Sequence, residues 1–254
     1  MKKALFYLLM FIVFQLLGGY IVNGLWSLLH ISAGQTIQII SASCLSSILI
    51  MAFFLLTRAA EVSPNWLRTR PWAVLIWSSL AALGAIIPSD WLQSLLPKLP
   101  NVVEEEFDMI LQNRWGYLAI GLLAPLCEEL AMRGAILRAL LQSPKLSPWG
   151  AIVISALFFA LIHLNPIQMP HAFLIGLLLG WMYYRTGSIL PGVALHWVNN
   201  TVAYILYNLY PDPEMDTVRF FGSQRAAMAA VFFSLCILLP AIYQLHLRMK
   251  KADE

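Results

Sequence analysis

The chain has 254 residues, of which 60% are hydrophobic and only 11% are charged. Soluble domains carry about 25% charged residues, so this composition excludes a soluble globular protein and predicts an all-α, polytopic membrane helical bundle. The net charge is +3 and no basic run is interleaved with aromatic residues, so nothing supports nucleic-acid binding.

Membrane-spanning helices need about 20 mostly apolar residues. We expect about eight such helices, at residues 4–29, 36–57, 71–88, 115–142, 147–164, 170–185, 187–210 and 224–247. The first follows Lys2 and Lys3 and exceeds the roughly 7–15 apolar residues of a signal peptide, so we interpret it as a retained span. Residues 91–113 are polar and amphipathic, which fits an interfacial segment or an ordinary loop equally well.

We expect one integral-membrane domain over residues 1–254. It comprises the N-terminal spans with the interfacial segment (1–113), the core helices with the candidate catalytic residues (114–210), and a loop with the last span (211–254).

Basic residues predict the orientation, because they favour the cytoplasmic ends of spans. One set of ends carries Lys2, Lys3, Arg58, Arg68, Arg70, Arg138, Lys145, Arg185, Arg248, Lys250 and Lys251. The opposite set carries Lys98, Arg114, Arg219 and Arg225, together with Glu104, Glu105, Glu106, Asp108, Asp212, Glu214 and Asp216. This predicts cytoplasmic termini, and the short lysine-rich start favours a multi-pass protein of a bacterial inner (plasma) membrane.

The fourth apolar segment contains two adjacent acids, Glu128 and Glu129, followed by Arg133. Ionisable groups inside a membrane are costly unless they are paired, and they usually mark a site. Glu129 and Arg133 are four residues apart and can pair on one helix face, whereas Glu128 lies about 100° round the helix. One arginine needs one carboxylate, so the second acid predicts a function. Pro125 should kink this helix and free the carbonyl of Gly121.

Two later segments carry helical pairs with the same four-residue spacing, Phe159 with His163 and His196 with Asn200. A histidine and asparagines in the middle of a span are costly without partners, so a functional and a structural role fit His196 equally well. His163 alone, followed by Asn165 and Pro166, fits an interfacial residue near a helix end better than a functional one. The remaining histidines are better explained as interfacial or structural residues: His30, His171 and His246.

Together these motifs resemble the CPBP family, the CAAX prenyl proteases and bacteriocin-processing (Abi) proteins. The resemblance rests on Glu128-Glu129-x-x-x-Arg133, Phe159-x-x-x-His163 and His196-x-x-x-Asn200 in this order, and on the run 185–189. It covers about residues 115–205. No recognisable signature lies in the first three spans.

The resemblance implies an intramembrane endopeptidase acting on a membrane-associated peptide or protein, with lipid as its surroundings. Glu128 would be the general base that activates water, and Glu129 would orient the water or hold Arg133. His163 would share the water, and His196 with Asn200 would stabilise the oxyanion. The neighbouring Cys127 is then a bystander, although the sequence also permits a thiol nucleophile.

A zinc-dependent version of the same protease stays open, with Glu128, His163 and His196 as ligands. No His-Glu-x-x-His motif is present, and a metal-free glutamate protease explains both acids and the asparagine, so we expect no cofactor. Two other functions are compatible with the sequence: a non-catalytic bacteriocin-immunity or partner-binding protein, and a proton-coupled transporter. Peptide maturation or immunity is favoured over cleavage of prenylated proteins only by family analogy.

Overall fold

The computed structural model describes residues 1–30, 34–61, 71–210 and 216–250, and these residues form helices and no strands. Helices occupy every predicted apolar segment. They are α1 (Lys2–Leu28), α2 (Gln35–Leu56), α4 (Pro71–Ser94), a continuous stretch of η1 (Leu118–Leu123), α6 (Ala124–Glu129), η2 (Leu130–Leu137) and α7 (Arg138–Leu141), then α8 (Pro148–Ile162), α9 (Met169–Thr186), α10 (Leu190–Leu209) and α12 (Gln224–Arg248). Short helices α5 (Glu104–Leu111) and α11 (Thr217–Phe221) lie between them.

Four helices in the described ranges are long and apolar enough to cross a membrane: α1, α2, α4 (as Trp72–Ser94) and α12. Helix α8 is apolar but shorter. The all-helical structure and these four helices agree with a membrane protein.

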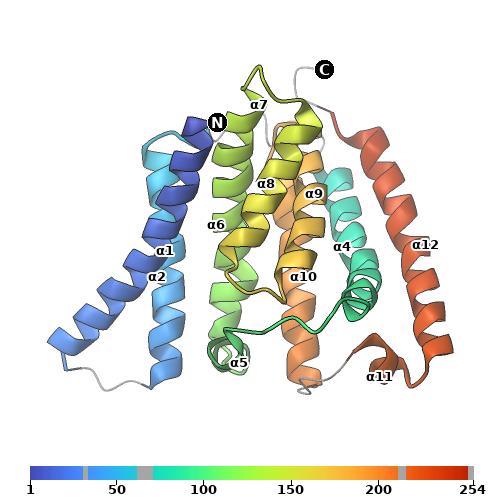
Figure 1. The fold of residues 1–254 in the computed structure, drawn as a ribbon, viewed down its shortest axis with the longest axis horizontal. Helices are drawn as coiled ribbons and strands as arrows, with labels where there is room; N and C mark the ends of the chain where they lie inside the picture. Colours follow the sequence, from blue (N-terminus) through green and yellow to red (C-terminus); the bar gives the residue numbers. More distant parts are fainter. Residues whose placement is uncertain (31–33, 62–70, 211–215, 251–254) are drawn as a thin grey trace.

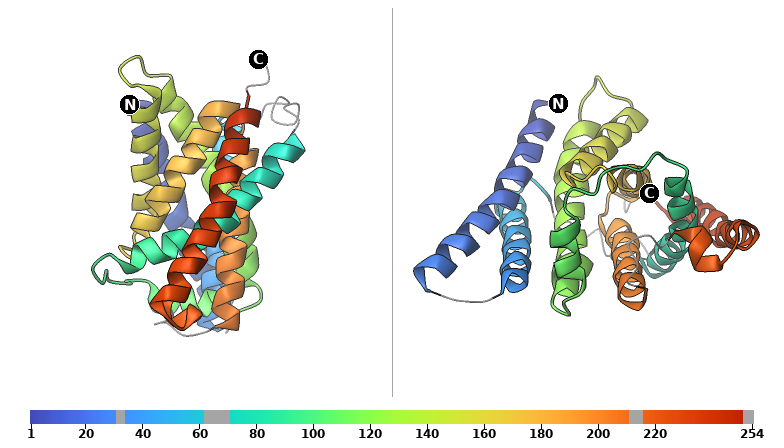
Figure 2. Two further views of the ribbon diagram at one scale, coloured as in Figure 1. Left: turned by 90° about the vertical axis from the view of Figure 1, so that its right-hand side faces the viewer. Right: turned by 60° about the horizontal axis from the view of Figure 1, so that its bottom comes forward.

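The helices form three groups that lie side by side (Figures 1 and 2). The α1–α2 hairpin lies on one side, α4 packs against α12 on the other, and the stretch η1–α7 lies with α8, α9 and α10 in the middle. Both chain termini lie at the same end of the bundle, as do the end of α2 and the end of α9 (Figure 1). Several charges used to predict the orientation lie outside the described residues: Arg68, Arg70, Lys251, Asp212 and Glu214.

Two helix boundaries differ from the predicted ones in an informative way. Helix α4 continues through Pro88 to Ser94, because a proline removes one helical hydrogen bond without necessarily ending the helix. Helices α8 and α9 meet part of the way along the bundle instead of reaching its far end (Figure 1). The end of α8 therefore lies part of the way along the length of the bundle.

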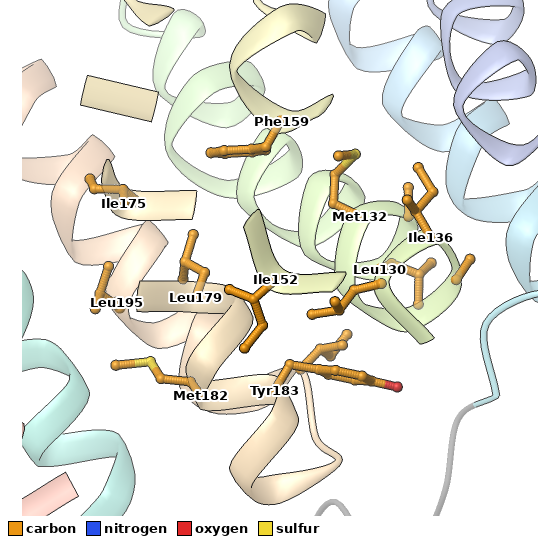
Figure 3. Close-up of a cluster of buried hydrophobic side chains, with 14 of the residues drawn as sticks. Leu130, Met132, Ile136, Ile152, Phe159, Ile175, Leu179, Met182, Tyr183 and Leu195 are labelled. Carbon is orange, nitrogen blue, oxygen red and sulfur yellow. The ribbon is translucent and has the colours of Figure 1, made fainter. Parts of the chain in front are cut away.

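Buried apolar side chains hold the central helices together (Figure 3). Met132, Ile152, Leu179 and Leu195 come from η2, α8, α9 and α10, and at most 1% of each is exposed. Small residues let two of these helices approach closely, since a Cβ atom on Gly176 would lie 3.1 Å from the Cα of Ala156. The helices that carry the candidate catalytic residues are thus fixed by dense packing.

Candidate active site

The helix that carries both glutamates changes its hydrogen-bond register around them. Glu128 and Glu129 lie in the α-helical turn α6, and the π-helical segments η1 and η2 precede and follow it. Such wide turns are rare and often mark functional sites. Pro125 lies in the first turn of α6, where a missing N–H is tolerated. The predicted disruption before the glutamates is therefore a change of register.

The register also decides which carbonyl lacks a helical donor. In an α-helix Pro125 would leave the carbonyl of Gly121 free, whereas in a π-helix the carbonyl five residues earlier, that of Ile120, loses its donor. The side-chain amide of Asn200 donates to the Ile120 carbonyl at 3.0 Å. Asn200 thus bonds a different carbonyl from the one predicted to be free.

Arg133 is completely buried and has three kinds of partner. Its Nη1 donates to Glu129 Oε1 at 2.8 Å, and its Nη2 donates to the carbonyl of Gly176 at 3.3 Å. Its guanidinium carbon lies 4.3 Å from the ring centroid of Phe159, which gives a cation–π contact. The predicted pairing of Glu129 with Arg133 is present, and Phe159 completes the surroundings of the charge.

His196 lies between the two carboxylates. Its Nδ1 is 3.2 Å from Glu129 Oε1, and its Nε2 is 3.8 Å from Glu128 Oε2. The first distance is a hydrogen bond, whereas the second is too long for one. Glu129 is fully buried, while the Glu128 side chain is 19% exposed and lines a cavity. The two acids therefore have different surroundings, one holding the imidazole and the other facing the cavity.

His163 caps the C-terminus of α8 and its ring orientation is fixed by the backbone. Nδ1 lies 2.7 Å from the carbonyl oxygen of Phe159. A carbonyl can only accept, so Nδ1 carries the hydrogen and Nε2 of the neutral ring is an acceptor. The Phe159 ring contacts His163 and His196 with its centroid 5.0 and 5.6 Å from theirs, both in edge-to-face geometry. Phe159 thus separates and positions the two histidines.

The turn that follows His163 is strained and held by one buried asparagine. Leu164 has φ = 51°, a left-handed conformation that is costly for a residue with a side chain. Asn165 is fully buried, accepts from the backbone N–H of Val102 at 3.2 Å and donates to Asn101 at 2.8 Å. Asn165 therefore ties the α8–α9 turn to the segment before α5 and supports the position of His163.

A cavity of ≈ 1140 Å³ joins the candidate residues. Its lining includes Glu128 from α6, His163 at the C-terminal end of α8, and both His196 and Asn200 from α10. Phe159 also lines it, whereas Glu129 and Arg133 lie behind the cavity wall and are fully buried. The order along the chain predicted that these residues belong together, and the structure brings all of them to one place.

Two further polar residues line this cavity: His171, which the sequence predicted to be interfacial or structural, and Asn199, for which it predicted no separate role. They lie within hydrogen-bonding reach of each other, and His171 is close enough to His163 and His196 to interact with both electrostatically. Neither residue belongs to a four-residue motif. The signal that could have found Asn199 is its place beside Asn200 in the middle of an apolar segment.

Zinc stays an alternative for this site. Within the described ranges, no three histidine, cysteine, aspartate or glutamate side chains lie close enough together to form a metal-ligand set. His163 and His196 each bond through Nδ1 to a carbonyl or a carboxylate. Such bonds also support histidine ligands in metal sites, because they leave Nε2 free.

These features define a helical membrane protein with a buried carboxylate–histidine site that opens into a polar cavity. Residues 110–202 match the family model described as type II CAAX prenyl endopeptidase Rce1-like. This segment contains every candidate catalytic residue, and the match is consistent with the predicted CPBP family of intramembrane proteases. No curated protein and no solved structure matches the chain.

Proposed function

We propose that the protein is an intramembrane endopeptidase of the glutamate type, which hydrolyses a peptide bond in a membrane-associated protein or peptide. The observation that carries this proposal is the position of His196 between two unlike carboxylates, one locked against Arg133 and one facing the cavity. A structural ion pair would require only Glu129. The second acid, at the cavity, is explained by catalysis.

Glu128 is the general base of the proposed reaction. It takes a proton from a water molecule in the cavity, and the water oxygen bonds to the peptide carbonyl carbon. His163 Nε2, the acceptor nitrogen of a ring fixed by its bond to Phe159, orients the same water through its second hydrogen. When the C–N bond breaks, Glu128 returns the proton to the leaving nitrogen, so a carboxylic acid and an amine are formed.

His196 and Asn200 are proposed to stabilise the developing oxyanion. One N–H of the Asn200 amide donates to the Ile120 carbonyl, which orients the amide and leaves its second N–H for the substrate. For His196 to donate from Nε2, the ring must also keep Nδ1–H on Glu129, so the proposal requires the doubly protonated ring during attack. Glu129, Arg133 and Phe159 act as positioning residues.

We further propose eight spans with both termini in the cytoplasm of a bacterial inner membrane. Support comes from the helices at all eight apolar segments and from the position of both termini at the end of the bundle that carries most basic residues. We also propose that no cofactor is needed.

A comparison of protein termini in membranes from three strains tests the function. The strains carry the wild-type protein, Glu128→Gln at matched expression, or a deletion of the gene. New N- or C-termini that occur only with wild type support proteolysis and identify a substrate. Identical termini in all three strains, with a deletion phenotype rescued by Glu128→Gln, would instead favour the non-catalytic partner-binding protein.

A further inference from the structure

The α1–α2 hairpin carries a polar face although both helices are strongly apolar overall. On α1, Gln15, Gly19 and Asn23 follow one another at four-residue intervals and therefore lie on one face. All three line the cavity that contains Glu128. No atom lies within 4 Å of the position that a Cβ of Gly19 would take, so this face is open.

The facing side of α2 continues the same polar surface. Its polar cavity-lining residues recur with the period of a helix: Gln35, Gln38, Ser43, Ser46 and Ser47. The Gln38 amide donates to the side chain of Asn23 at 2.6 Å, which joins the two helices. Ser47 lies close to Cys127, the residue next to Glu128. The polar face therefore leads along α2 to the proposed base.

The opposite wall of the cavity has a different character. Helix α5 and the segment after it contribute Phe107, Ile110 and Ile120, while α10 contributes Tyr204 and Tyr207. Among the described residues that line the cavity, Glu128 is the only carboxylate, there is no lysine or arginine, and the basic groups are His163, His171 and His196. The cavity thus has one wall of amides and hydroxyls and one wall of apolar and aromatic groups.

We infer that the polar face of α1–α2, defined by the residues above, forms a groove that binds an extended peptide segment of the substrate; this inference rests on the proposed function. A peptide in extended form offers its own N–H and C=O groups to amides and hydroxyls on one side, and its alternate side chains to an apolar wall on the other.

The dimensions give the length of that segment. From Gln35 to Ser47 the helix rises about 18 Å at 1.5 Å per residue. An extended chain rises about 3.3 Å per residue, so this face accommodates about five substrate residues between the far end of α2 and the level of Glu128. The segment enters from the end of the bundle opposite the chain termini, where α2 begins (Figure 1).

Photo-crosslinking in the Glu128→Gln background tests the inference. The photoreactive amino acid p-benzoylphenylalanine replaces Ala42, a partly exposed residue of the groove, and as a matched control Ile48, which is 50% exposed and outside the cavity lining. We expect position 42 to crosslink the protein whose cleavage is lost in Glu128→Gln, within about five residues of the scissile bond. Position 48 should not crosslink it. Equal crosslinking from both positions, or no crosslink to this protein from position 42, would overturn the inference.

Cleavage by groove variants gives a second readout in the otherwise wild-type protein. At equal membrane levels, Ala42→Trp should lower the yield of the new terminus about tenfold or more, since a misplaced substrate loses its catalytic alignment, whereas Ile48→Trp should retain it. If Glu128→Gln abolishes cleavage but Ala42→Trp does not change it, the groove assignment is wrong and the proposed function stands. If Glu128→Gln leaves cleavage unchanged, both are wrong.

Discussion

Removing Arg133 should be among the most damaging single changes to the stability of the protein. In Arg133→Met, Glu129 keeps a fully buried carboxylate without its closest cation. The lost contacts are a charge-assisted hydrogen bond of about 1.5–3 kcal/mol, a cation–π contact of up to about 2 kcal/mol and a bond to the Gly176 carbonyl of about 1 kcal/mol. This agrees with the roughly 3–5 kcal/mol typical of breaking a buried pair.

The melting temperature of the purified protein in lipid nanodiscs measures this effect. For a chain of this size each kcal/mol shifts the midpoint by about 2–4 °C, so Arg133→Met should melt about 6–20 °C lower than wild type. The double variant Glu129→Gln/Arg133→Met removes both charges and should recover most of that loss. It should stay inactive, because His196 has lost the carboxylate that orients it. A midpoint for Arg133→Met within about 2 °C of wild type would contradict the reasoning.

Three other changes probe the rest of the site. Gly192→Ala should abolish most activity, because its new Cβ would lie 2.8 Å from Glu129 Oε2. The control Gly24→Ala should retain activity, since no atom lies within 4 Å of its Cβ position. Equal activities of the two variants would refute the claim that Glu129 must stay in place. Asn200→Leu should lower the cleavage rate by about 10²–10³-fold, since the oxyanion loses a donor. It should also lower the free energy of unfolding by about 1–3 kcal/mol, since the Ile120 carbonyl loses its donor. An unchanged rate and melting curve would exclude both the catalytic and the structural role of Asn200. Chelators should leave cleavage intact, and a loss of cleavage that added zinc specifically reverses would establish the zinc-dependent mechanism.

Much of the fold could be predicted because membrane helices follow from local composition. The apolar segments end within a few residues of the helices, since length and hydropathy decide them. The motif residues also come together as expected, because Glu129–Arg133 is a contact within one helix and the two histidine motifs place one helical face each toward it. The four-residue spacing of these residues and the cost of burying ionisable groups in a membrane were sufficient to predict the candidate site.

Other features depend on contacts between distant segments, and no local pattern encodes them. The π-helical register around Pro125 moves the orphan carbonyl from Gly121 to Ile120, and Asn200 on another helix compensates for it. In the sequence, Asn165 only supports an interfacial position for His163, whereas in the structure its bonds to Asn101 and Val102 hold the turn after His163. The position of His163 inside the bundle likewise depends on where α8 ends, which hydropathy alone does not determine.

The groove along α1–α2 illustrates the same limit. Its glutamines and serines are dispersed in two apolar segments that carry no family motif. They form part of the cavity wall only because the hairpin packs beside the helix that carries Glu128. The helical period of these polar residues was nevertheless present in the sequence. A search for periodic polar residues within apolar segments would have found it.

The central claim is that Glu128 is the general base of a hydrolysis, and the most direct measurement is the cleavage rate of purified protein in liposomes. Wild type and Glu128→Gln are compared at matched folding, on a peptide that spans the bond identified in cells, in the presence of a chelator. The account predicts that wild type cleaves the peptide and that Glu128→Gln is slower by about 10²–10⁴. A Glu128→Gln rate within about tenfold of wild type would contradict it.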